Sequence, residues 1–328
     1  MVARTLSLAL IAACCTARAD EPVARVVESH GYAKAIELKL GTTRAVLCPE
    51  VGGRVLEFSR GGADAMYFDP AEKKRTPGKP GPVSAGRFDY GPELVVTPHP
   101  KKWGGEWSAE IAKDESVKLT GPDDAGIRVT REFRLVKHRE SVGLSCVQTL
   151  TNTGDAVREV CHWGRSFSPA GGICAIPLGD RPSRFPSKYA MYEEGATINV
   201  RPADDNIRER DGFLEIVAPP RKPKLGFDTY AGWLAYVMPG DVAFVKRFPT
   251  FHDRVYNEAA AITLSVWSPK GAMIELEPIG PRERLKPGAS ASFTEDWWLL
   301  PHPFPKPGAK LDLKALAAQV EKETLPPK

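Results

Sequence analysis

Residues 272–280 read AMIELEPIG, a stretch in which apolar and acidic side chains alternate. Side chains of a β-strand point in turn to its two faces, so Ile274 and Leu276 would share one face and Glu275 and Glu277 the other. The two carboxyl groups would lie roughly 7 Å apart, because each residue advances a strand by about 3.4 Å. The alternation predicts a strand with one buried face, and it leaves open whether the acidic face meets solvent or a ligand.

Runs of the same kind recur along the chain, separated by Gly, Pro, Asn and Asp residues that favour turns. They occupy residues 32–40, 42–48, 53–59, 126–136, 140–152, 232–238, 242–248, 261–267, 272–278 and 292–300. A dozen or more short strands with short links favour a large antiparallel sandwich or barrel. We therefore predict an all-β fold in which residues 20–328 form one domain.

One segment has a helical pattern instead. Residues 311–323, LDLKALAAQVEKE, follow a Pro-rich stretch and place apolar side chains at helical spacing. They predict a short helix in a C-terminal appendage of about 309–325, packed outside the sheets.

The composition is that of a soluble globular protein. The chain has 328 residues, 42% of them hydrophobic, and a net charge of +4. Short basic clusters lie in Pro- and Gly-rich loops among acidic residues, so we expect no nucleic-acid partner. The apolar runs are too short to predict a transmembrane span.

Four cysteines follow the N-terminal segment: Cys48, Cys146, Cys161 and Cys174. Their spacings match no zinc pattern and include no Cys-x-x-Cys pair, so we expect no metal site. Cys146 and Cys161 fall within apolar strand patterns typical of buried thiols. Disulfides remain an alternative in an oxidising compartment, and the sequence does not say which cysteines would pair.

Residues 1–19 have the pattern of a secretion signal, with a charged start at Arg4, a short apolar run and a small-residue cleavage pattern before Asp20. Their removal takes away two arginines and lowers the net charge from +4 to +2. We therefore expect an extracytoplasmic mature protein, either periplasmic or secreted. In an alternative interpretation, residues 11–14 resemble a bacterial lipobox, and Cys14 would carry a lipid anchor.

Residues 150–172, LTNTGDAVREVCHWGRSFSPAGG, place a turn and a strand before a Gly- and Pro-containing loop. His162 lies next to Trp163 and near Arg165 in this strand. A histidine within a strand is more often structural than catalytic, but its aromatic and cationic neighbours here favour a sugar site. The C–H faces of a sugar stack on aromatic rings, whereas its hydroxyl groups need hydrogen-bond partners.

Three elements of the sequence resemble the galactose mutarotase-like (aldose 1-epimerase) superfamily. The turn, strand and histidine of residues 150–172 resemble its Thr-Asn…His-aromatic element, and GGRVLEFSRGGADAMYFDP (52–70) resembles its opening hairpin with a turn at Gly52-Gly53. IELEP (274–278) and the later LKPGASASFTEDWWL (285–299) resemble its closing region. In order and spacing the three elements cover most of the chain, and they are most similar to the bacterial DUF4380-like relatives of the mutarotases.

The resemblance implies a β-supersandwich of antiparallel sheets with a sugar site on a concave face. It implies that Glu277 is the general base that takes the proton of the anomeric hydroxyl. His162 would be the general acid that protonates the ring oxygen, so that the ring opens and recloses as the other anomer. A mutarotation of this kind needs no metal and no organic cofactor, and its substrate would be a free or terminal sugar.

The sequence departs from the family pattern around His162. Cys161 stands where the family has Asn, and Trp163-Gly164-Arg165 stands where it has Tyr-Phe-Asn. Trp163 and Arg165 are our candidates for substrate contacts in this segment. The family's His-Gly-Gly motif is absent, and His99 in TPHPKKWGGEW (97–107) is the candidate for its second substrate-binding histidine.

Two further residues are candidates for the sugar site. Arg87, in AGRFDYGPE (85–93), is the candidate for the arginine that holds a ring hydroxyl, and Trp103 is a candidate stacking platform. Both segments can also be read as loops with incidental polar residues. Glu275 is read as a surface residue, unless its face is the concave one, in which case its charge would raise the pKa of Glu277.

Three functions follow from this reading. The first is an aldose 1-epimerase-like enzyme, the second a carbohydrate-binding protein without catalysis on the same fold, and the third a polysaccharide lyase or glycosidase. Convergence of His162, Glu277 and an arginine on one cleft would favour the epimerase. An aromatic cleft without these residues would favour the binding protein.

Overall fold

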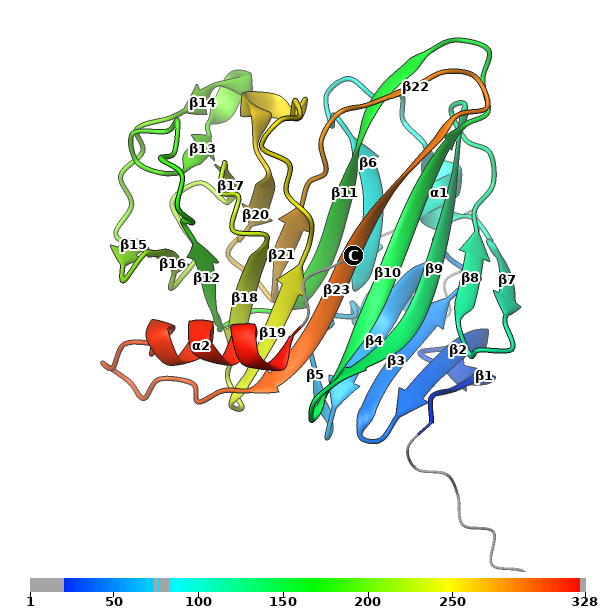
Figure 1. Ribbon diagram of the computed structural model, residues 1–328, viewed down its shortest axis with the longest axis horizontal. Helices are drawn as coiled ribbons and strands as arrows, with labels where there is room; N and C mark the ends of the chain where they lie inside the picture. The colour runs from blue at the N-terminus through cyan, green and yellow to red at the C-terminus, as the bar shows by residue number, and fades with distance from the viewer. Residues whose placement is uncertain (1–20, 74–75, 77–78, 80–82, 325–328) are drawn as a thin grey trace, which may run out of the picture.

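In the residues that the structure describes, two large antiparallel β-sheets pack face to face and are accompanied by two short α-helices (Figure 1). The computed structural model describes residues 21–73, 76, 79 and 83–324. The predicted secretion signal and the candidate lipid-anchor residue Cys14 lie outside the described residues. In the described part, no helix is long and apolar enough to cross a membrane.

The larger sheet has thirteen strands. In spatial order it contains β1 (Val23–Ser29), β2 (Tyr32–Leu40), β3 (Thr43–Cys48), β4 (Arg54–Arg60), β6 (Gly86–Gly91), β11 (Arg158–Pro169), β21 (Met273–Pro278), β20 (Leu264–Trp267), β17 (Lys224–Phe227), β13 (Ala190–Tyr192) and β14 (Ile198–Asn199). Off this path, β5 (Ala63–Asp64) pairs with β4, and β22 (Glu283–Leu285) pairs with β11. Strands distant in the sequence therefore meet at its centre, where β6, β11, β21, β20 and β17 are neighbours.

The smaller sheet has ten strands. In spatial order these are β15 (Ile207–Arg210), β16 (Phe213–Ile216), β12 (Ile173–Pro177), β18 (Trp233–Met238), β19 (Val242–Arg247), β23 (Ser290–Pro301), β10 (Ser141–Asn152), β9 (Ile127–His138), β8 (Val117–Thr120) and β7 (Ser108–Ile111). The helices are α1 (Pro100–Gly104) and α2 (Leu313–Glu323), with 3-10 turns η1 (Pro70–Glu72), η2 (Glu194–Ala196) and η3 (Ala259–Ala261).

The main hydrophobic core fills the space between the two sheets. Phe88 of the larger sheet stacks on Trp297 of the smaller sheet, with ring centroids 5.4 Å apart. Ile274 and Leu276 of β21 belong to the same core. The side of β21 that carries the glutamates therefore faces away from the smaller sheet.

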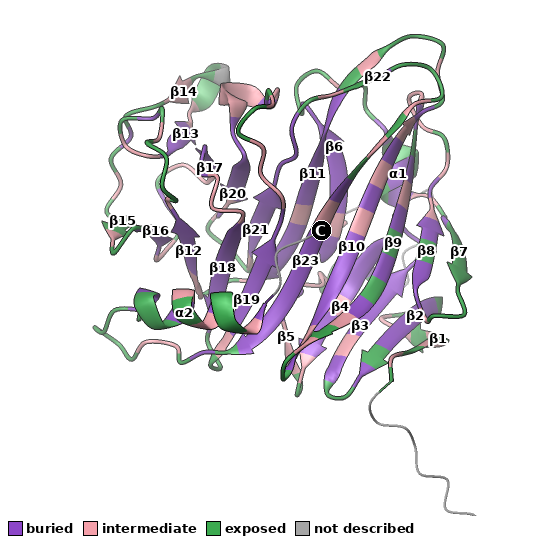
Figure 2. Cartoon of the chain, in the orientation of Figure 1, coloured by how far each residue is buried: buried purple, intermediate pink, exposed green. Residues whose placement is uncertain are grey.

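Helix α2 packs against part of the outer face of the smaller sheet, in front of β18 and β19 (Figure 1). In β18 the alternation serves two layers: Leu234 and Tyr236 point into the main core, whereas Trp233, Ala235 and Val237 pack in a second cluster with α2. This double burial explains why residues 233–238 are apolar throughout, and the strand is buried along its whole length (Figure 2). The predicted helix and its position outside the sheets are confirmed.

The opening hairpin turns at Gly52 and Gly53, as the sequence predicts. Both residues have left-handed backbone conformations, with φ of 75° and 53°. A Cβ atom on Gly53 would lie 2.5 Å from the ring of Trp107, and one on Gly52 would lie 2.5 Å from the carbonyl oxygen of Trp103. Glycine is therefore required at both positions, and the turn packs closely against the segment that carries α1.

Most predicted strands are present, and residues 32–40 match β2 exactly in both bounds. The segment 85–93 could also be read as an irregular loop, but its residues 86–91 form β6 in the centre of the larger sheet. The cysteines Cys48, Cys146, Cys161 and Cys174 are all buried free thiols, so the disulfide alternative does not apply to these four residues.

Candidate functional site

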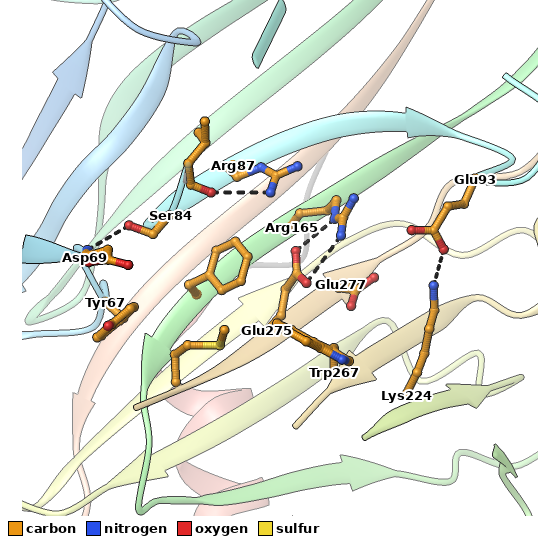
Figure 3. A pocket seen from close by; sticks show the side chains of 13 residues that line it. Tyr67, Asp69, Ser84, Arg87, Glu93, Arg165, Lys224, Trp267, Glu275 and Glu277 are labelled. Carbon is orange, nitrogen blue, oxygen red and sulfur yellow. Dashed lines mark hydrogen bonds and ion pairs between the residues drawn. The ribbon is translucent and has the colours of Figure 1, made fainter. Parts of the chain in front are cut away.

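A pocket of about 470 Å³ opens on the outer face of the larger sheet, above its central strands (Figure 3). Its lining combines aromatic, cationic and acidic side chains: Tyr67, Asp69, Val83, Ser84, Arg87, Glu93, Arg165, Phe167, Lys224, Trp267, Met273, Glu275 and Glu277. The size is within the usual range for small-molecule sites, roughly 300–1,000 Å³.

The acidic face of β21 forms one wall of this pocket. Glu275 and Glu277 each expose only 1% of their surface, although both project away from the core between the sheets. The interpretation of Glu275 as an ordinary surface residue is therefore wrong. Side chains of the neighbouring strand β11 lie against both carboxyl groups, Arg165 against Glu275 and Trp163 against Glu277.

Glu277 is a lining residue whose pKa is raised toward neutral pH. The indole Nε1 of Trp163 donates a hydrogen bond of 2.7 Å to its Oε2. Burial, together with the negative charge of Glu275, raises the pKa of Glu277 to about 8. At neutral pH this carboxyl group can therefore both release and accept a proton.

Glu275 forms an ion pair with Arg165 from the adjacent strand β11. The Nε of Arg165 donates to Oε1 of Glu275 at 2.8 Å, and its second terminal nitrogen lies 3.4 Å from Oε2. Burial acts to lower the pKa of Arg165, but the charges of Glu275 and Glu277 outweigh it and raise the pKa. The pair fixes both side chains on one side of Glu277.

Arg87 of β6 lies directly opposite Arg165 of β11 in the strand register. Its guanidinium lies over the rings of Trp103 and Phe167, at 5.0 and 5.7 Å from their centroids. It also donates a long hydrogen bond of 3.3 Å to the carbonyl of Val83. The arginine predicted to contact substrate thus lines the pocket, as Figure 3 shows.

Asp89 is a buried anchor beside the pocket that the sequence analysis missed. Its carboxylate accepts hydrogen bonds from His99 Nε2 at 2.6 Å and from Trp103 Nε1 at 3.1 Å. Burial acts to raise its pKa, but the hydrogen bond from His99 and the nearby arginine charges outweigh this, so the pKa lies below its usual value. His99 and Trp103 therefore hold the Asp89 carboxylate, and the ring of Trp103 also lies against the guanidinium of Arg87.

His162 does not reach the pocket. Its ring stacks on Phe293 of the other sheet, and its Nε2 lies 3.2 Å from the carbonyl oxygen of Ala291. Burial lowers its pKa to about 4. The strand alternation is the physical reason: Trp163 and Arg165 face the pocket side of β11, so His162 between the sheets cannot pair with Glu277.

A buried lysine supports β21 from the interior. Lys246 Nζ donates to the carbonyl of Leu276 and to Ser166 Oγ, both at 3.0 Å, and forms an ion pair with Glu295 at 3.0 Å. Gly164 makes room for this network, because a Cβ atom there would lie 1.8 Å from Glu295 Oε1. The strand that carries the site glutamates is thereby tied to the opposite sheet.

Several lining residues were not predicted, among them Phe167, Lys224 and Trp267. Phe167 shares a face with Arg165 two residues earlier, so the same alternation could have found it. Lys224 and Trp267 belong to β17 and β20, which join the site only through the strand order. No local signal in the sequence marks them.

The polar groups of the pocket are carboxyl groups, guanidinium groups, one ammonium group and the hydroxyl groups of Tyr67 and Ser84. Within residues 21–73, 76, 79 and 83–324, no group of three or more His, Cys, Asp or Glu side chains is placed to hold a metal ion. The arrangement offers proton transfer at Glu277 and hydrogen bonds to a polar ligand, beside the aromatic surfaces of Phe167 and Trp267.

Two facing antiparallel sheets, with a polar pocket on the outer face of the larger one, define a galactose mutarotase-like β-sandwich. The predicted fold is confirmed by solved structures of low sequence identity. A galactose mutarotase-like protein of Clostridium acetobutylicum is 12% identical with a TM-score of 0.55, over 86% of this chain and 99% of that one.

Two other solved structures agree with this fold. A galactose mutarotase-like protein of Lactobacillus casei is 12% identical with a TM-score of 0.54, over 81% of this chain and 100% of that chain. A candidate aldose 1-epimerase of Escherichia coli K12 is 14% identical with a TM-score of 0.56, over 81% of this chain and 99% of that chain. No family model and no curated protein matches the sequence. Similarity at this identity shows the fold alone, and the relation to DUF4380-like proteins stays a prediction.

Proposed function

We propose that the pocket binds a sugar and that Glu277 transfers the proton that interconverts its anomers. The observation that carries this proposal is the position of Glu277, a pocket-lining carboxyl group whose burial and neighbouring charge raise its pKa to about 8. A general base works best with a pKa near the working pH. The fold is consistent with this activity, and so is a lining that mixes aromatic rings with polar groups.

The reaction needs two proton transfers. The Glu277 carboxylate takes the proton of the anomeric hydroxyl, the C1–O1 double bond forms, and the bond from C1 to the ring oxygen breaks as that oxygen gains a proton. After rotation about the C1–C2 bond, the same steps in reverse close the other anomer. His162 cannot supply the second proton, because it lies between the sheets.

Lys224 is the proposed donor of that second proton. Its ammonium group lines the same pocket and lies 5.0 Å from the centroid of the Trp163 ring, whose Nε1 is bonded to Glu277. It is paired with Glu93 at the pocket edge. Lys224 and Glu277 thus reach the ligand space from two strands, as Figure 3 shows.

Sugar binding without catalysis is the second candidate function. The position of His162 between the sheets, away from the pocket, favours it. The glycosidase alternative is less compatible with the geometry. Glycosidase carboxyl groups flank the scissile bond, whereas Glu275 and Glu277 project from one strand, and Glu275 is held by Arg165.

The test is the rate of anomer interconversion, followed by polarimetry or NMR saturation exchange with several aldoses. Glu277→Gln should reduce the catalysed rate about 10²- to 10⁴-fold, the usual contribution of a general base. Lys224→Met should also reduce it, whereas the neighbouring Lys222→Met and the exposed Glu110→Gln should not. The catalysed rate of the unmodified protein should rise with pH up to about 8, as Glu277 ionises.

Unchanged interconversion in Glu277→Gln would refute the role of this residue. No interconversion by the unmodified protein, with sugar binding still measurable by calorimetry, would establish the binding function instead.

A further inference from the structure

Two arginines lie side by side at the pocket, although like charges opposite each other destabilise a pair of strands. Arg87 and Arg165 are directly paired in the register of β6 and β11. Their side chains are 13% and 15% exposed, so solvent screens them little. Such a pair is stabilised when negative charges meet both guanidinium groups.

Arg165 has its counter-charge within the protein. It is bonded to Glu275 at 2.8 Å, and it lies 3.7 Å from Asp89 Oδ2. Arg87 has no such close counter-charge. The nearest oxygen of Asp89, Oδ2, lies 4.0 Å from it and already accepts a hydrogen bond from Trp103. Among the described residues, Arg87 has no carboxylate oxygen within hydrogen-bond distance.

Arg87 is nevertheless held in place. The rings of Trp103 and Phe167 lie against its guanidinium, and one terminal nitrogen donates to the carbonyl of Val83. A guanidinium has five N–H donors, so most of them are available to the pocket. Burial and the charge of Arg165 lower the pKa of Arg87, although Glu275 and Asp89 act to raise it.

We propose, on the basis of the sugar-binding function above, that the ligand is an acidic sugar whose carboxylate forms a two-pronged ion pair with Arg87, as in a hexuronic acid. The planar guanidinium matches the two oxygens of a carboxylate. Glu277 then faces the anomeric end of the same sugar. A single negative charge suits the site better than a phosphate dianion, because Glu275 and Glu277 line the same pocket and Asp89 lies 4.0 Å from Arg87.

The test compares the affinities of galacturonate and glucuronate with those of galactose and glucose, by calorimetry at low salt. The unmodified protein should bind the uronates at least about tenfold more tightly than the matching hexoses. Arg87→Gln should lower the uronate affinity about ten- to hundredfold and the hexose affinity less, so that the preference for uronates over hexoses is lost. Arg87→Lys should recover part of the loss, because it restores the charge without the planar fork.

Arg128→Gln is the matched control, because it removes an arginine that is paired with Asp123 on the surface. Its uronate affinity should not change. Thermal melts of all variants show whether each one is folded.

Equal affinities for uronates and hexoses would overturn the acidic-sugar proposal and leave the sugar-binding function standing. Failure to bind or interconvert any of the four sugars would overturn both. Tighter binding of hexose phosphates than of uronates would overturn the choice of a carboxylate.

Discussion

The raised pKa of Glu277 predicts that the stability of the protein depends strongly on pH. Its carboxyl group has a pKa of about 8 in the folded protein, against 4.5 ordinarily. Between these values the unfolded chain has released the proton and the folded protein retains it. The folded state is therefore favoured by its tighter proton binding at Glu277. This contribution to stability is complete below pH 4.5 and is lost as the pH rises through 8.

The magnitude follows from the two pKa values. Each pH unit between them lowers the free energy of unfolding by about 1.4 kcal/mol, which amounts to about 5 kcal/mol over the whole interval. Gln has the shape of Glu and can still accept the hydrogen bond from Trp163, but it does not ionise. Glu277→Gln should therefore resemble the unmodified protein near pH 5 and be more stable than it near pH 8.

Urea unfolding of both proteins at several pH values measures this difference. The advantage of Glu277→Gln should grow by about 4 kcal/mol between pH 5 and pH 8. Glu110→Gln, on the exposed strand β7, controls for the loss of one carboxyl group. Growth of less than about 1 kcal/mol would refute the conclusion that burial keeps Glu277 protonated.

Two other predictions concern the space between the sheets. Lys246→Met should destabilise the protein by about 3–5 kcal/mol in urea unfolding, because it leaves Glu295 charged and unpaired in the interior. The double variant Lys246→Met with Glu295→Gln should recover part of this loss. A cost below about 1 kcal/mol for the single variant would contradict a stabilising ion pair. Burial lowers the pKa of His162 from 6.5 to about 4, so at acid pH the unfolded chain binds this proton more tightly than the folded protein does. The free energy of unfolding should therefore fall by up to about 3 kcal/mol as the pH drops from 6.5 through 4. His162→Leu should lack this acid sensitivity and keep its sugar affinity, and a loss of sugar binding in this folded variant would return His162 to the site.

The fold was accessible from the sequence because it depends on a local signal. Alternation in β21 placed Ile274 and Leu276 in the core and both glutamates on the other face, and the turn at Gly52 followed from residue type. The same signal showed that His162 and Trp163 face opposite ways. The assignment of His162 as an acid came from the family resemblance, and the alternation of β11 overrides it.

Apart from residues such as Phe167, the rest of the site could not be predicted, because alternation does not say what covers a face. Glu275 is buried beneath side chains of other strands, with Arg165 of β11 bound to its carboxylate. Asp89 and Lys224 join the site through the order of strands, which brings β6 and β17 to the two sides of β11, β21 and β20. That order depends on long-range pairing, for which a single sequence carries no local pattern.

Lys246 has an electrostatic consequence for the pocket as well as a structural one. Its ammonium binds the carbonyl of Leu276, between the two glutamates, from the opposite side of the strand. Burial lowers its pKa, while Glu295 and, more weakly, Glu277 and Glu275 act to raise it. By reciprocity, the ammonium favours the ionised form of Glu277. The pKa of Glu277 therefore depends in part on a residue outside the pocket lining, and a substitution at position 246 would shift that pKa without changing any residue that lines the pocket.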